Sequence, residues 1–368
     1  MISRPTRIFV WAWLTMTCSL AAAQPLGALG DDFVYRVRPG DTLIGLAGAY
    51  TRNEANWSVL QRLNSVTDPH RLMVGRELRI PFSMIPERPA ASQVVHVSGA
   101  ASIDGAPLRV GMTVAEGAVI TTAPNGFVTL QLADGSKVTL PQQGTTELQR
   151  LRQFDGSELT DSILRVESGV VESHVAPSGQ GVGRFEVRTP VAVTGVRGTR
   201  FRVRADTQGV RSEVIDGSVR LHSHASGHSP GAAVAVNRGH GAVVGADGVL
   251  KGVHTLLPAP TVGEPRKAGS GQWTAAVSPV PGAVAYRVQV SRDADGLELT
   301  SSQRFAGTDI RFSAPGSGVY FVAVRAIDAA GIEGSDAKLQ FEATNVLTTA
   351  WGFPVSLEHG GVVTLADY

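Results

Sequence analysis

Hydrophobic and polar residues change their spacing twice between residues 33 and 81. Apolar side chains first alternate with polar ones, then recur at helical intervals, and finally alternate again. The alternating apolar positions are Phe33, Tyr35 and Val37 at the start and Leu78 and Ile80 at the end. The helical positions are Leu43, Leu46, Ala47 and Tyr50, then Trp57, Leu60 and Leu63. The pattern predicts a β-α-α-β unit, in which Gly40 forms a tight turn and Asp41 or Thr42 caps the first helix.

Two motifs frame this unit. It opens with Tyr35-Arg36-Val37-Arg38-Pro39-Gly40-Asp41-Thr42-Leu43 and closes with Gly75-Arg76-Glu77-Leu78-Arg79-Ile80-Pro81. Over residues 33–82 the pattern resembles a LysM module, a family that binds N-acetylglucosamine-containing glycans such as peptidoglycan or chitin. The resemblance implies that peptidoglycan is a partner of this chain.

The resemblance also implies a shallow sugar-binding groove between the loop after the first strand and the loop before the second. The implied glycan contacts are Gly40, Asp41, Thr42 and Leu43 in the first loop, and Pro69, His70, Arg71, Leu72 and Met73 in the second. Backbone groups at bent loops can bond the N-acetyl amide, while Leu72 and Met73 cover its methyl group. Alternatively, Asp41 and Thr42 only cap a helix and Leu72 only fills the core. The family usually has Asp and Ile where this chain has His70 and Leu72, a difference that can alter ligand preference.

The first 23 residues have the pattern of a cleavable secretory signal peptide. Arg4 and Arg7 precede an apolar run over residues 8–20, and small residues at 21–23 precede Gln24. The run is shorter than the ~20 residues of a membrane-spanning helix, and no later stretch approaches that length. We therefore expect no transmembrane segment in the mature chain and a periplasmic, wall-associated location. The single cysteine, Cys18, lies in this signal, so the mature chain is expected to form no disulfide.

Proline-rich breaks suggest how the 368 residues divide into domains. The predicted division is a signal peptide at 1–23, a LysM module at 33–82, a linker at 83–92, an all-β domain at 93–257, a sandwich at 260–345 and an unassigned tail at 346–368. The predicted fold class is therefore multidomain and mainly β.

The middle region is rich in Val, Thr and Gly and contains short alternating runs broken by Asp-Gly turns. Two hairpins are predicted, one between residues 127–132 and 137–140, the other between 211–215 and 218–221. The segment from Phe185 to Phe201 resembles the signature of the FecR domain.

That family includes periplasmic regulators that relay the occupancy of an outer-membrane iron transporter to a sigma factor. Such a regulator needs a cytoplasmic segment and a membrane helix, whereas a signal peptide and a glycan-binding module stand at that end here. The resemblance therefore implies a β-rich, partner-binding or scaffolding domain and leaves its sensing role open.

A basic stripe is predicted within this domain. Phe185, Val187, Phe201 and Val203 should face inward by the period of two, which leaves Arg188, Arg200, Arg202 and Arg204 exposed on the other face. The stripe is either a solvated strand face or a speculative binding surface for an acidic envelope partner.

The third region resembles a fibronectin type III sandwich. The resemblance rests on Val277-Ser278-Pro279-Val280-Pro281-Gly282-Ala283, on Tyr286-Arg287-Val288-Gln289-Val290-Ser291, and on the run from Gly318 to Asp328. Such domains commonly carry Trp just before the turn, where this chain has Val277. Trp273 lies four residues earlier on the same face and is expected to fill part of that core.

The sequence indicates neither an enzyme nor a cofactor. It contains no His-Glu-x-x-His motif, no phosphate-binding loop and no mature cysteine nucleophile. His222, His224 and His228 form the only metal-like cluster, and no acid or cysteine follows to complete it, so an exposed polar loop is favoured over a metal site. A formal net charge of +1 with interleaved signs argues against a nucleic-acid partner.

Two function classes remain open. The first is a noncatalytic periplasmic protein that anchors partner-binding β domains to peptidoglycan. The second is an envelope sensor, signalling or assembly factor whose FecR-like domain reads a ligand or an outer-membrane partner. A wall hydrolase with an unrecognised site is a weaker third hypothesis.

Overall fold

The structure is a computed structural model that describes most of the chain between residues 27 and 344. The described ranges are 27–29, 31–155, 159–177, 182–196, 198–224, 233–269 and 271–344, with the single residues 349, 355 and 363. The predicted signal peptide, His228 and nearly all of the tail lie outside them. Strands dominate, which confirms the mainly-β fold class. Among the described residues, no helix has the length and apolar character needed to cross a membrane.

The first module has the predicted β-α-α-β order. Its elements are β1 (Gly27–Leu29), β2 (Asp32–Arg36), α1 (Leu43–Thr51), η1 (Glu54–Asn56), α2 (Trp57–Leu63) and β3 (Glu77–Pro81). The strands form an antiparallel sheet in the order β1-β2-β3. Phe33 and Leu43 are fully buried in its core, and most of the other predicted apolar positions join them. Tyr50 and Trp57 are only partly buried, and Leu63 at the end of α2 is exposed. The added strand β1 was not predicted.

The predicted linker is folded onto the next domain. It contains η2 (Phe82–Met84) and β4 (Glu87–Pro89), and β4 pairs with the end of β12 (Thr145–Phe154). Phe82 stacks on Phe154 with ring centroids 4.8 Å apart. Phe154 therefore completes the core of the first module from the neighbouring domain.

The middle domain consists of two sheets. Its strands are β5 (Ser92–Ser98), β6 (Ala101–Ile103), β7 (Ala106–Pro107), β8 (Thr113–Val114), β9 (Val119–Thr122), β10 (Phe127–Gln131), β11 (Lys137–Leu140), β12, β13 (Thr160–His174), β14 (Val182–Arg188), β15 (Ala192–Val196), β16 (Arg200–Asp206), β17 (Gly209–Asp216), β18 (Ser218–Ser223), β19 (Val234–Asn237), β20 (His240–Gly245) and β21 (Leu250–Thr255).

One sheet has the order β7-β6-β9-β12-β13-β14-β15-β18-β19, and the other β8-β5-β10-β11-β13-β16-β17-β20-β21. The long strand β13 belongs to both sheets. Its first half pairs with β12 and its second half with β16.

One predicted hairpin is confirmed and the other is wrong. β10 and β11 pair across the turn at Gly135. β17 and β18 do not pair, although Gly217 adopts the expected positive φ of 82° between them. Instead β17 pairs with β16 and β20, and β18 with β15 and β19. The turn therefore carries the chain from one sheet to the other. The pairing of each strand depends on packing in the whole domain and not on the turn alone.

The third region is a sandwich of three strands against four. The strands are β22 (Arg266–Gly269), β23 (Gln272–Ala276), β24 (Ala285–Ser291), β25 (Leu299–Phe305), β26 (Asp309–Ser313), β27 (Gly318–Ile327) and β28 (Ala337–Ala343). The sheet orders are β22-β23-β26 and β25-β24-β27-β28, which agree with the fibronectin type III-like prediction. Trp273 is buried in the core against Phe341, as expected.

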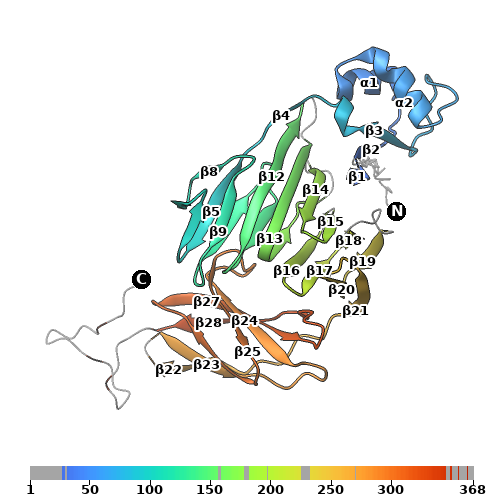
Figure 1. The fold of residues 1–368 in the computed structure, drawn as a ribbon. Helices are drawn as coiled ribbons and strands as arrows, with labels where there is room; N and C mark the ends of the chain where they lie inside the picture. The colour runs from blue at the N-terminus through green and yellow to red at the C-terminus, as the bar shows by residue number, and fades with distance from the viewer. Residues whose placement is uncertain are drawn as a thin grey trace, which may run out of the picture.

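The first module and the sandwich lie at opposite ends of the middle domain (Figure 1). The four-stranded sheet of the sandwich turns its outer face toward the middle domain, so β24 is buried on both faces. Contacts at this junction include the Gln142 side chain, whose Nε2 donates to the Ser302 carbonyl at 2.6 Å. The two β domains therefore share a packed junction.

Candidate functional site

Hydrogen bonds within the first loop of the predicted groove fix the conformation of that loop. Gly40 has a φ of 89°, a left-handed conformation in which a side chain is strained. The Asp41 carboxylate accepts from the Tyr35 hydroxyl at 2.8 Å and from the Arg38 N–H at 2.7 Å. Burial, together with this contact to Asp41, raises the pKa of Tyr35, so the hydroxyl remains a donor. Thr42 caps α1 by accepting from the Gly45 N–H, as one of the two predicted caps.

The second loop presents apolar side chains next to the first. The Leu43 N–H donates to the Pro69 carbonyl at 3.1 Å, which joins the two loops directly. The Met73 side chain is 69% exposed, and Leu72 is half-buried against the module core. His70 and Arg71 are exposed on the same loop. The arrangement offers backbone polar groups, a flexible thioether and an apolar edge, which are the features expected for an N-acetylated sugar.

The nine predicted glycan contacts are brought together on these two loops, but their side chains differ in what they can reach. The Leu43 side chain is fully buried in the core, so only its backbone faces the loop junction. Asp41 and Thr42 serve the loop and the helix cap, which is the alternative left open from the sequence. The side chains of His70, Arg71, Leu72 and Met73 remain available for direct contact.

The predicted exposed basic stripe is wrong. Arg188 lies on β14 in the other sheet and pairs with Glu186 at 2.7 Å. Arg200, Arg202 and Arg204 do share one face of β16, but the sandwich covers that face. Arg202 is only 3% exposed. The period of two placed Phe201 and Val203 correctly inside, yet it cannot tell whether water or another domain meets the opposite face.

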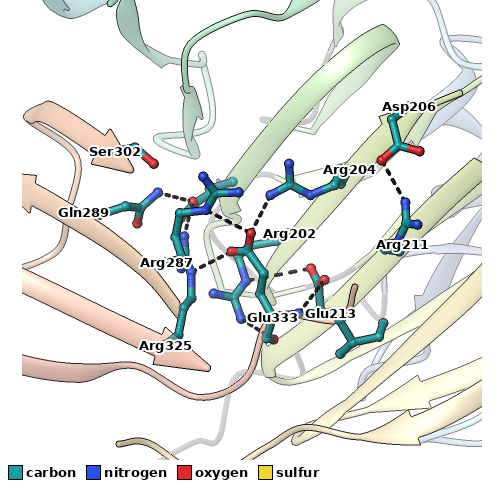
Figure 2. A network of polar contacts seen from close by, with 12 residues as sticks. Arg202, Arg204, Asp206, Arg211, Glu213, Arg287, Gln289, Ser302, Arg325 and Glu333 are labelled. Atoms are coloured by element: carbon teal, nitrogen blue, oxygen red, sulfur yellow. Dashed lines mark hydrogen bonds and ion pairs between the residues drawn. The ribbon is translucent and has the colours of Figure 1, made fainter. Parts of the chain in front are cut away.

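Glu333 of the sandwich meets Arg202 and Arg204 of this face (Figure 2). The Glu333 carboxylate bonds Arg204 of the middle domain and Arg287 and Arg325 of its own domain. Although burial opposes ionisation, the surrounding arginines, Arg325 first, hold the pKa of Glu333 well below its usual range. The acidic partner that the stripe suggested is therefore within the same chain. Glu333 carried no sequence signal, because an acid in a strand-connecting loop is normally solvated.

His174 lies at the edge of the same junction, opposite Arg200 on the neighbouring strand β16. Burial and the Arg200 charge lower the pKa of His174 from its ordinary value of 6.5 to about 4, against the opposing charges of Glu172 and Asp295. Lys338 lowers it further. The folded protein therefore holds this imidazole neutral under mildly acidic conditions.

We expect the free energy of unfolding to fall as the pH drops from about 6.5 to about 4. Between these values His174 is protonated in the unfolded state but not in the folded state, so a falling pH favours unfolding. His174→Gln should flatten this part of the pH profile in urea titrations. His70→Gln, at an exposed loop position, is the control and should leave the slope intact. An unchanged slope in His174→Gln would show that the imidazole reaches water.

Of the three histidines in the predicted cluster, the structure describes His222 and His224. His222 is the last residue but one of β18 and His224 follows the strand. No group of three potential metal ligands occurs among the described residues. The same segment reads Gly227-His228-Ser229-Pro230-Gly231, the spacing of a hydrolase nucleophile elbow. Such an elbow joins a strand to a helix, and residues 227–231 lie outside the described residues.

Comparisons with known proteins match two parts of the chain. The LysM domain model matches residues 35–81, and the model described as FecR protein matches residues 118–220. No curated protein matches the chain. Both matching families are of binding or signalling kinds.

Among solved structures, a candidate anti-sigma factor from Parabacteroides distasonis ATCC 8503 aligns at 19% identity over 37% of this chain, with a TM-score of 0.30. The alignment covers 59% of that protein's chain. The FN1–FN3 domains of chicken CNTN1 align at 10% identity over 70% of this chain and 99% of theirs, with a TM-score of 0.21. Scores this low do not establish a shared fold. By its family matches, the chain contains a LysM domain at residues 35–81 and a FecR domain at residues 118–220.

Proposed function

We propose that this protein is a noncatalytic periplasmic protein that binds the N-acetylglucosamine-containing glycan of peptidoglycan and presents its β domains to an envelope protein partner. The observation that carries the proposal is the LysM domain with its two loops joined by the Leu43–Pro69 hydrogen bond. The modules we assign are 33–82 for glycan binding, 83–92 as connection, 93–257 as the FecR-like domain and 260–345 as the sandwich, with export directed by residues 1–23.

The chemistry of the loops supports an uncharged sugar ligand. An N-acetyl group needs one donor, one acceptor and an apolar contact for its methyl. The bent backbone around Gly40 and Pro69 can supply the polar groups, and Met73 the apolar contact. A shallow contact of this size gives weak binding for one sugar unit, which repetition along the wall polymer strengthens.

We expect Met73→Asp to reduce binding to purified sacculi by about tenfold, because losing one apolar contact and adding a charge removes roughly 1–2 kcal/mol. The exposed position of Met73 means that the stability of the module should hardly change. Sedimentation of the mature chain with sacculi, over a range of sacculus concentrations, measures the change. Val59→Asp is the matched control, since Val59 is an exposed apolar residue on α2 of the same module.

A backbone variant separates the loop from the side chain. Gly40→Val should reduce binding and also destabilise the module, because a β-branched residue is strained at a φ of 89°. If Met73→Asp and Gly40→Val both sediment like the unchanged protein, the glycan site lies elsewhere. The protein is also incubated with sacculi, with and without zinc, and the supernatant is assayed for soluble glycan fragments. Release of such fragments would overturn the noncatalytic assignment.

A second candidate function is envelope signalling, which the FecR match over residues 118–220 favours. In that case glycan binding only localises the protein, and the FecR domain reads a protein or small ligand. Photo-crosslinking from exposed positions of the middle domain on either side of this match, such as Val110 and Val249, would identify the partner. Capture of a transporter or a regulator supports signalling, whereas capture of wall enzymes or structural proteins supports the scaffold.

A further inference from the structure

The loop between β27 and β28 projects from the sandwich into the middle domain. It contains Asp328-Ala329-Ala330-Gly331-Ile332-Glu333-Gly334-Ser335-Asp336. The Asp328 carboxylate accepts from the N–H groups of Ala330 and Ile332, both at 2.9 Å. Gly331 has a φ of 81°, so the turn is shaped by its own residues. The loop therefore resembles a preformed ligand more than a flexible connection.

Ile332 is the apolar anchor of this loop. Its side chain is only 1% exposed. It lies over Gly241 of β20, where a Cβ atom would come within 2.9 Å of the Ile332 Cδ1 atom. The missing side chain at Gly241 thus makes a notch that accepts one branched apolar residue.

Arginines of the middle domain recognise the loop backbone. Arg202 donates to the carbonyls of Glu333 at 3.0 Å and Gly334 at 2.8 Å. Arg211 donates to the Ala330 carbonyl at 2.9 Å. In the opposite direction, the Glu333 N–H donates to the Glu213 carboxylate at 3.2 Å. Most of these bonds would form with any segment of the same backbone shape.

One arginine of this surface is held in place by contacts within its own domain. Arg211 is fixed by Asp206 and Gln208, each at 2.8 Å, as Figure 2 shows for Asp206. Arg204, by contrast, is held by the Glu333 carboxylate of the loop itself. Arg211 is therefore positioned independently of the loop, so this part of the surface is prepared for binding.

We propose that this face of the FecR-like domain is a peptide-binding cleft, formed by Arg202, Arg204, Arg211, Glu213 and Gly241, and that the β27–β28 loop is its resident ligand and keeps it closed. The class of external ligand is a protein turn with a branched apolar residue followed by Glu and Gly. Such a partner gains access only when the sandwich moves away. The proposal does not depend on glycan binding.

The test uses the full mature chain with Ile332→Asp, which places a carboxylate in the apolar notch and should release the loop. Val319→Asp, at an exposed position of β27, is the matched control. Because the mature chain has no cysteine of its own, cysteines introduced at the exposed positions Val110 and Val284 can carry spin labels. Pulsed electron resonance should then show a longer or broader distance distribution for Ile332→Asp only.

Fluorescence anisotropy of a labelled peptide of residues 326–338 measures the affinity of that peptide for the opened cleft. We expect at least about tenfold tighter binding to Ile332→Asp than to the unchanged protein or to Val319→Asp, since the resident loop competes at high effective concentration. The same peptide carrying Ile332→Asp should not bind. Ile332→Ala provides a milder release, with intermediate opening and affinity, should the acidic variant fail to fold.

Three results would overturn the proposal. An opened variant that does not bind the peptide would make the contact a domain junction only. Equal peptide binding by unchanged and released protein would show that the loop does not close the cleft. Unchanged label distances in both Ile332 variants would show that the loop does not hold the sandwich in place.

Discussion

Replacing Phe154 with alanine is expected to lower the free energy of unfolding by about 3–5 kcal/mol and to loosen the LysM domain as well. Phe154 is fully buried, and it stacks on Phe82 at the end of the first module. The cavity would therefore open between two modules. Urea unfolding measures the loss, and hydrogen exchange over residues 77–89 reports whether the LysM sheet and the connection to it open.

Phe201→Ala is the matched control, because Phe201 is equally buried but lies in the core of the middle domain alone. It should destabilise the protein by a similar amount and leave exchange in residues 77–89 unchanged. If the two variants affect that segment alike, the stacking of Phe82 on Phe154 does not couple the modules. The LysM domain would then be a loosely tethered anchor.

The LysM domain could be predicted from sequence because its signals are local. A turn at Gly40, a cap at Thr42 and two helical repeats each depend on residues a few positions apart. The groove loops followed from the same motifs. What sequence could not assign was the role of Asp41, whose carboxylate is used by Tyr35, a neighbour only in the folded strand-loop geometry.

The middle domain was predictable as β structure but not in its pairing. The Asp-Gly turns before Ser136 and Ser218 look alike in sequence, yet one closes a hairpin and the other connects two sheets. Turn chemistry specifies the local backbone angle in both cases. Partner choice depends on strands far away in sequence, such as β20 for β17.

The junctions between modules were the least predictable feature. Residues 83–92 looked like a polar spacer because of Pro86 and Pro89, but β4 pairs along the free side of β12. Proline has no N–H group to donate to a neighbouring strand, so it is tolerated in a short edge strand such as β4. At the other end, Glu333 and Arg325 read as ordinary surface charges, since nothing in the neighbouring sequence shows that another sheet will cover them.

Arg325→Met should destabilise the protein by about 3–5 kcal/mol, because removing one member of a buried ionic network leaves its partners uncompensated. The Arg325 guanidinium is 3% exposed and bonds Glu333 at 2.7 Å and Glu172 of the middle domain at 2.8 Å. Burial lowers the pKa of Arg325, whereas the nearby carboxylates, Glu172 first, raise it. The carboxylates have the larger effect, so the pKa is raised. Urea unfolding at neutral pH measures the loss.

Two further variants decide whether the loss comes from the buried charges. Arg304→Met, at an exposed position of β25, should change stability by less than about 0.5 kcal/mol. Glu333→Gln combined with Arg325→Met should cost less than the sum of the single changes, since the two charges depend on each other. Additive effects, or a loss below about 1 kcal/mol for Arg325→Met, would mean that water screens the pair as it does on a surface. The junction would then be held chiefly by apolar contacts such as that of Ile332 with Gly241, and the arginines would serve to select the occupant of the cleft.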